Sequence, residues 1–359
     1  MDAQSMSREN KPLTSIRGFA AIWVVALHFV PSSKGIVANL AYAGYTAVDL
    51  FFILSGLILA CVYADLARGT AGLFWLKRVC RIYPLHIVST VILVALMVQV
   101  DPSLIRQYPG PILDALLLVH PFVDMPLAMP GNPPSWSIGI EMVCYLIFPL
   151  LIALYRSPAS RLLHIAILAA LLAAEFAVQI EDGTAIHGEW AMLRGLVGFL
   201  IGLSLWRLGR GVEIDASRLS LCECASVAAM LLAALIGSPE VIPLFAALLL
   251  FCLMFDAGVV ARFLRRPICL WLGHISFSIY LLHFVIVYAA IQYFPARAMP
   301  IHGGLGRTLW ELGLIGALLG LSTLTYHTIE LPGRRIPALI AGWKARRLRA
   351  QGGQAMPAI

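Results

Sequence analysis

Two apolar stretches near the start of the chain decide the fold: LTSIRGFAAIWVVALHF at residues 13–29 and GYTAVDLFFILSGLILA at residues 44–60. Each approaches the roughly 20 residues that a helix needs to cross a bilayer. Arg17, His28 and Asp49 interrupt them, and such side chains are costly in hydrocarbon unless they face a protein interior or a wet cavity. The stretches therefore predict a helical membrane bundle that encloses a polar site. Hydrogen bonds that merely join helices are the alternative for each residue taken singly.

The composition of the whole chain also indicates a membrane protein. Of its 359 residues, 60% are hydrophobic and 13% are charged, whereas about 25% of the residues of soluble domains are charged. The mean hydropathy is +0.86. A soluble globular domain is therefore excluded. The seven cysteines lie mostly in apolar runs and form no CxxC pair, so we expect no disulfide framework and no metal site.

The apolar runs predict an all-α polytopic membrane protein with a bundle of about ten transmembrane helices. The candidate spans are residues 13–31, 42–63, 82–100, 135–155, 162–179, 190–206, 219–236, 240–256, 269–294 and 308–329. A weaker run at 111–128 contains Pro121 and Pro126, so we expect it to lie outside the membrane or to be re-entrant.

The distribution of Lys and Arg orients these spans. If the N-terminus is cytoplasmic, 21 of these residues fall on the cytoplasmic side and four in the outer loops, while Arg194 lies within a span. An excess of Lys and Arg is typical of cytoplasmic loops, so we expect both termini in the cytoplasm and an even number of spans. The net charge of +7 is then a topology signal that requires the lipid bilayer and no nucleic acid as partner. We divide the chain into a transmembrane domain at 1–335 and a basic cytoplasmic tail at 336–359.

The intramembrane polar residues form two groups on this map. Arg17 lies near the cytoplasmic end of the first span, and Arg78 and Arg81 stand just before the third. His28 follows Arg17 by eleven residues, roughly 16 Å further along a helix. Two acidic residues lie on spans that descend from the outer side, Asp49 and Glu141. The pattern predicts a basic cluster at a cytoplasmic opening and a His/Asp/Glu set deeper in the membrane.

This arrangement suits acyl transfer from a donor that carries phosphates. Arginine binds phosphate bidentately and keeps its charge. Imidazole titrates near neutrality, which suits a general base, and a neighbouring carboxylate can hold its tautomer.

Six segments, in order, resemble the acyltransferase-3 family of integral-membrane acyltransferases. They are RGFA at 17–20 with His28 downstream, VDLFFILSG at 48–56, KRVCRIYP at 77–84, PSWSIGIEMVCYLIFPLL at 134–151, LGHISFSIYLLH at 272–283 and ELP at 330–332. The first matches the family's Arg, ten residues, His pattern, and the third its Arg-x-x-Arg followed by Tyr-Pro. One departure is Met142, which stands where many members have a second acid.

The resemblance implies ten transmembrane helices, cytoplasmic termini and transfer of an acyl group, commonly acetyl, to a hydroxyl of a carbohydrate or related molecule. Carried over residue by residue, it implies that His28 is the catalytic residue. The implied donor contacts are Arg17, Arg78 and Arg81, and the implied acid-pocket or acceptor residues are Asp49 and Glu141.

Structural roles compete with these assignments. His28 could make a structural hydrogen bond, and Arg78 and Arg81 could be ordinary cytoplasmic anchors. Asp49 could pair between helices with Arg17 or with Arg194.

Ser55, Gly56 and His283 also allow a structural and a functional interpretation. We interpret Ser55 and Gly56 as small residues for close helix packing rather than as a nucleophile, because no GxSxG motif is present. His283 either faces the cavity or packs in the core.

We therefore expect a multi-pass O-acyltransferase of the bacterial cytoplasmic (inner) membrane that moves an acyl group from acyl-CoA to a carbohydrate or glycan. We expect acyl-CoA to be a donor substrate, with no permanently bound cofactor, and polysaccharide-assembly proteins as partners. The alternative is a transporter or flippase of a polar or glycan substrate that uses the buried His and carboxylates as a proton relay. Consumption of acyl-CoA distinguishes the two.

Overall fold

The computed structural model describes residues 9–29, 35–66, 70–122, 131–158, 160–293 and 304–352. Within these ranges the chain is almost entirely helical and contains no strand. Nine helices of this part of the chain are long and apolar enough to cross a membrane, and a shorter apolar helix lies at Pro239–Leu253. The predicted all-α membrane bundle is thereby confirmed. The side of the membrane on which the termini lie stays a prediction.

The helices follow the predicted spans in chain order. Their bounds are α1 (Lys11–Phe29), α2 (Ile36–Tyr42), η2 (Ala43–Thr46), α3 (Ala47–Tyr63), α4 (Ala71–Val100), α5 (Leu104–Gln107), α6 (Pro109–Leu116), η4 (His120–Phe122), η5 (Pro133–Ser135), α7 (Trp136–Tyr155), α8 (Arg161–Asp182), α9 (Gly188–Gly209), α10 (Ala216–Ile236), η6 (Pro239–Val241), α11 (Ile242–Leu253), α12 (Val259–Leu264), α13 (Pro267–His274), α14 (Ser276–Tyr293), α15 (Gly304–Thr325), η7 (Tyr326–Glu330) and α16 (Leu331–Gly352).

Two predicted boundaries are wrong. The third span was expected to begin at residue 82, but α4 begins at Ala71 and passes through Pro84. The last span was expected to end at residue 329, but helical conformation continues from α15 through η7 to Gly352. In both places the apolar run ends at charged residues, at 77–81 and 330–335, but the helix continues through them. Membrane helices also tolerate an internal proline where a neighbouring helix packs against it. Here α16 covers Pro84, since a Cβ at Gly333 would come within 3.0 Å of its ring.

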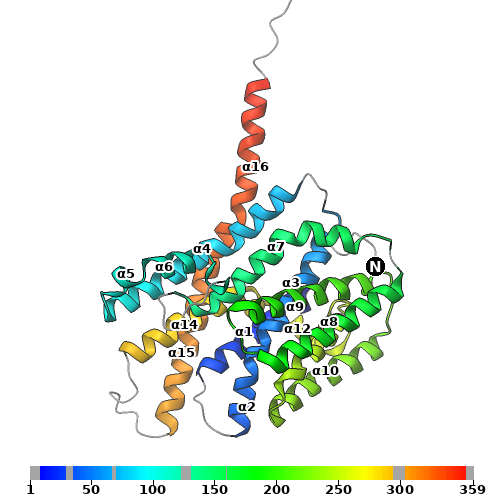
Figure 1. Ribbon diagram of the computed structural model, residues 1–359, viewed down its shortest axis with the longest axis horizontal. Helices are drawn as coiled ribbons and strands as arrows, with labels where there is room; N and C mark the ends of the chain where they lie inside the picture. The colour runs from blue at the N-terminus through cyan, green and yellow to red at the C-terminus, as the bar shows by residue number, and fades with distance from the viewer. Residues whose placement is uncertain are drawn as a thin grey trace, which may run out of the picture.

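The predicted tail at 336–359 lies partly in α16, and residues 353–359 are outside the described ranges. Figure 1 shows α16 (red) extending away from the bundle. The weak run at 111–128 contains α6 and η4, and neither belongs to a candidate span; Pro126 lies outside the described residues.

The centre of the bundle is the contact between α3 and α9. Each has 67% of its most apolar window buried, more than the other candidate spans. Glycines allow this approach, because a Cβ at Gly56 would lie 2.1 Å from the Phe199 carbonyl oxygen and one at Gly202 would lie 2.1 Å from that of Ile53. Small residues let membrane helices pack backbone to backbone. The predicted packing role of Gly56 is therefore confirmed.

Candidate active site

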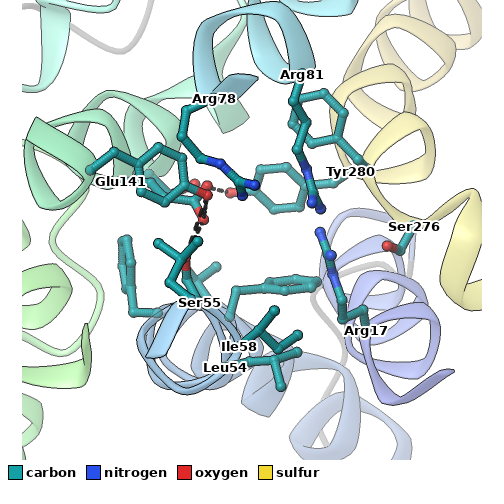
Figure 2. Close-up of a pocket in the computed structure, with 16 residues that line it drawn as sticks. Arg17, Leu54, Ser55, Ile58, Arg78, Arg81, Glu141, Ser276 and Tyr280 are labelled. Atoms are coloured by element: carbon teal, nitrogen blue, oxygen red, sulfur yellow. Dashed lines mark hydrogen bonds between the residues drawn. The ribbon is translucent and has the colours of Figure 1, made fainter. Parts of the chain in front are cut away.

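A cavity with a volume of about 70 Å³ lies between α1, α3, α4, α7 and α14 (Figure 2). The charged and hydrogen-bonding side chains on its walls include Arg17, Ser55, Arg78, Arg81, Glu141 and Tyr145. Apolar side chains of α3, among them Phe51 and Leu54, form much of the remaining wall. Four of the residues predicted from the sequence therefore meet in one cavity, although they come from three helices.

The three arginines differ in how the protein holds them. Arg78 donates from Nη2 to the Tyr63 hydroxyl at 3.0 Å, and its guanidinium lies 5.3 Å from the Tyr63 ring centroid and 5.6 Å from that of Tyr145. Arg17 and Arg81 are half-buried, and Figure 2 shows their guanidinium groups facing each other. Within the described ranges no hydrogen bond or salt bridge joins either of them to another side chain, although Glu141 and Glu330 lie near enough to attract Arg17. Two cations that repel each other thus line one cavity.

Close packing beside Arg17 determines where its side chain enters the cavity. A Cβ at Gly18 would lie 2.6 Å from the Leu272 backbone, and one at Gly273 would lie 2.2 Å from the Thr14 carbonyl oxygen. Helices α1 and α13 are therefore in backbone contact at the turn that carries Arg17, and neither glycine can be enlarged without moving α1.

Glu141 is the acidic member of the cavity wall, and two hydroxyl groups hold its carboxylate. Its Oε1 accepts from the Ser55 hydroxyl at 2.6 Å and from the Tyr145 hydroxyl at 2.5 Å. From the sequence we expected Ser55 to serve helix packing, but its side chain points into the cavity and bonds to Glu141. The sequence indicates the contact between Tyr145 and Glu141, because positions i and i+4 share a helix face. No spacing in the sequence pairs Ser55 with a residue 86 positions away.

The start of α7 is fixed by a polar network, which explains how Glu141 is positioned. Asn132 donates to the Ser89 hydroxyl at 3.1 Å and to the Leu281 carbonyl at 3.0 Å. The Ser137 and Tyr280 hydroxyls lie 2.8 Å apart and both line the cavity. The loop before α7 is thus tied to α4 and α14.

His120 of η4 lies close to this loop, because its Nε2 is 3.5 Å from the Ser135 hydroxyl. Burial and the neighbouring His86 lower the pKa of His120 to about 4, so His120 is neutral at physiological pH.

Asp49 lies away from this cavity and pairs with Arg194. Its two carboxylate oxygens accept from Nε at 3.0 Å and Nη2 at 2.9 Å, and both side chains are at most 1% exposed. Arg194 also donates to the Ala185 carbonyl at 2.9 Å. Glu175 is fully buried nearby and accepts from Gln179 at 3.0 Å. The sequence left Arg17 and Arg194 open as partners, and the structure pairs Asp49 with Arg194, where the carboxylate holds α3 and α9 together.

His28 lies at the far end of α1 from Arg17 and does not line the cavity. Its side chain is exposed, and its Nδ1 lies 3.0 Å from the Val24 carbonyl oxygen. The ring packs against His283, with centroids 4.9 Å apart. The predicted His/Asp/Glu set is therefore not formed. Glu141 lies with the arginines and Asp49 pairs with Arg194, while the partners of His28 come from α14 and its own helix.

A second basic–acidic set borders the arginines and was missed from the sequence. Glu330, 1% exposed, accepts from the Ser278 hydroxyl at 2.5 Å and from Arg334 Nη2 at 2.9 Å. Glu330 ends a π-helical turn, Tyr326–Glu330, a feature that often marks functional sites. Arg334 lies near enough to repel both Arg17 and Arg81. The ELP segment at 330–332 was part of the family resemblance, but a helix that continues from it to Arg334 was not expected.

Comparison with known proteins identifies the family of the chain. The profile described as "Acyltransferase domain", that of the acyltransferase-3 family, matches residues 11–327, so the chain belongs to this family. It is 31% identical over 319 residues to the acyltransferase MdmB of Streptomyces mycarofaciens, covering 77% of this chain and 78% of MdmB. It is 22% identical over 358 residues to the O-acetyltransferase OatA of Staphylococcus aureus, covering 90% of this chain and 57% of OatA. No solved structure matches the chain. The protein is therefore a multi-pass membrane O-acyltransferase.

Proposed function

We propose that the protein moves an acyl group, acetyl above all, from cytoplasmic acyl-CoA to a hydroxyl of a carbohydrate or glycan acceptor at a bacterial cytoplasmic (inner) membrane. The observation that carries the proposal is the pair Arg17 and Arg81, half-buried cations that face one cavity without a side-chain partner in the described ranges. Burying unpaired charge is costly, so such a site is stabilised by an anion. The phosphates of acyl-CoA supply that charge, and arginine binds them bidentately.

The chemistry then spans the length of α1. With the donor phosphates at the arginines, the acyl thioester reaches toward His28, eleven residues or roughly 16 Å away along the helix. His28 Nε2 takes the proton of the acceptor hydroxyl, whose oxygen attacks the thioester carbon. The new C–O bond forms, the C–S bond breaks, and the proton passes to the CoA thiolate. Exposure of His28 lets an acceptor approach the ring without entering the arginine cavity.

The names of the relatives support the choice of substrate class. OatA is called an O-acetyltransferase and MdmB an acyltransferase. The name of OatA indicates transfer of an acetyl group to oxygen, and that of MdmB indicates acyl transfer. We therefore propose acetyl as the transferred group and place the acceptor in the broad class of carbohydrates and glycans, with polysaccharide-assembly proteins as partners. Both termini are proposed to lie in the cytoplasm, where the arginines meet the donor.

Donor turnover tests the proposal. The purified protein in proteoliposomes should release free CoA from acetyl-CoA when a glycan acceptor is supplied. Arg81→Lys keeps the charge but loses the planar fork, so the KM for acetyl-CoA should rise ~10-fold or more, the value of one charged hydrogen bond. Arg218→Lys is the matched control, because Arg218 is an exposed residue of α10 outside the cavity. An unchanged donor titration for Arg81→Lys, or no CoA release by the wild type, would refute the donor site.

A further inference from the structure

A buried histidine lies directly behind His28 and belongs to no role described so far. His283 of α14 is fully buried, and its ring centroid is 4.9 Å from that of His28, with the ring planes inclined by 50°. Helices α1 and α14 pack against each other along this contact. One imidazole of the pair is thus exposed and the other is enclosed by protein.

The hydrogen bonds determine the tautomer of both rings. His28 Nδ1 lies 3.0 Å from the Val24 carbonyl oxygen, and His283 Nδ1 lies 2.6 Å from that of Tyr280. A carbonyl oxygen can only accept, so each Nδ1 carries the hydrogen and each neutral ring has a bare Nε2. In both rings the lone pair that can accept a proton is therefore that of Nε2.

The Nε2 atom of His283 is unpaired. It is buried and has no hydrogen-bond partner among the described residues, which is costly for an acceptor. Two other aromatic rings lie beside the His283 ring, that of Tyr280, with a centroid 5.9 Å away, and the apolar ring of Phe284. The Tyr280 hydroxyl already pairs with Ser137. Among the titratable rings that the described part of the chain places beside His283, His28 of α1 is therefore the one free to supply a proton.

We propose that His283 is a positioning residue that stabilises the imidazolium formed on His28 during transfer; this inference rests on the proposed role of His28 as general base. After His28 Nε2 takes the acceptor proton, its N–H turns to the bare Nε2 of His283, and the proton is held between the rings until the CoA thiolate takes it. The two rings hold one proton and not two, because adjacent imidazolium ions repel each other.

Two amide variants separate this role from a packing role. His283→Asn keeps an N–H where Nδ1 donates to the Tyr280 carbonyl but has no acceptor at the Nε2 position. His283→Gln places an amide oxygen near the Nε2 position and loses the Nδ1 donor. We expect His283→Asn to lower kcat by ~10- to 100-fold, the value of a hydrogen bond to a charged group, with an unchanged KM for acetyl-CoA. His283→Gln should keep most of the rate. The reverse order would show that His283 only packs and bonds to Tyr280, and would overturn the proposal.

Two further measurements distinguish a failure of this proposal from misfolding of the variants and from a failure of the role proposed for His28. In a His28→Ala background, His283→Asn should cause no additional loss, because it acts through His28; an independent loss would overturn the inference. If His28→Ala itself transfers acyl groups at the wild-type rate, the role of His28 fails instead. Should His283→Asn lose acetyl-CoA binding, added imidazole is tested on His283→Gly: recovery of kcat supports the shared proton, and no recovery overturns it.

Discussion

The pair formed by Asp49 and Arg194 decides whether Asp49 belongs to the reaction or to the scaffold. The family resemblance implies a place for Asp49 in the acid pocket, whereas the structure gives both of its oxygens to Arg194. Arg194→Met removes the cation and leaves two fully buried acids, Asp49 and Glu175, without it. Breaking a buried ion pair from one side typically costs about 3–5 kcal/mol, so we expect this loss in the free energy of unfolding.

Because Glu175 lies beside the pair, Asp49→Asn and Arg194→Met should differ in how much they lower the free energy of unfolding. In Asp49→Asn, Glu175 still opposes the charge of Arg194, and the amide oxygen can still accept one N–H. We therefore expect a smaller loss, about 1–3 kcal/mol, as for one impaired buried hydrogen bond. The double variant Asp49→Leu with Arg194→Met should recover the part of the loss in Arg194→Met that Asp49 causes, because apolar replacements of buried pairs are often neutral, while Glu175 stays buried without the cation.

The measurement is reversible SDS-induced unfolding in mixed micelles, followed by acyl transfer counted per folded molecule. A scaffold role predicts that all three variants transfer at the wild-type rate once corrected for folded protein. Two results would refute it: an Arg194→Met variant that unfolds at the wild-type SDS fraction, or an Asp49→Asn variant that is as stable as the wild type but does not transfer.

Three further predictions concern the site and its packing. His28→Ala should slow transfer by ~100- to 10,000-fold at normal abundance, while His164→Ala, which removes a ring bonded to its own helix in the same way, should not; equal rates for both would contradict the base assignment. Glu141→Gln removes the negative charge that shares the cavity with the arginines, so it should strengthen acetyl-CoA binding by calorimetry; weaker binding would contradict a donor site at the arginines. Gly56→Ala should reduce the yield of folded protein by fluorescence-detected size exclusion, whereas Gly320→Ala, which meets open space, should be silent; equal yields would contradict the α3–α9 contact.

The spans and their order could be predicted because the bilayer constrains them locally. In lipid every backbone polar group must be satisfied within the segment, so each apolar run of sufficient length becomes a helix whatever its neighbours are. The bounds of α4 and of α15 to α16 could not, because charged residues end the apolar runs at 77–81 and 330–335, whereas the helices continue through these residues and pack against each other. The local hydrophobicity therefore failed to predict these helix ends, because contacts between helices far apart in the sequence extend both helices.

For the site, the residue types came from the sequence and their partners from the fold. Arg17, Arg78, Arg81 and Glu141 were predicted because intramembrane charge is rare and therefore functional, and the structure brings them to one cavity.

The pairings were beyond reach, because each joins positions far apart in the chain. Asp49 and Arg194 are 145 residues apart, and Ser55 and Glu141 are 86 apart. A helix presents any side chain to one of several neighbours, and spacing along the chain determines the face and depth of that side chain but not which neighbour lies there. The sequence by itself therefore determined the bundle and the chemical character of the site, while only the packing of α1 against α14 and of α3 against α9 decided which groups share a proton and which share a salt bridge.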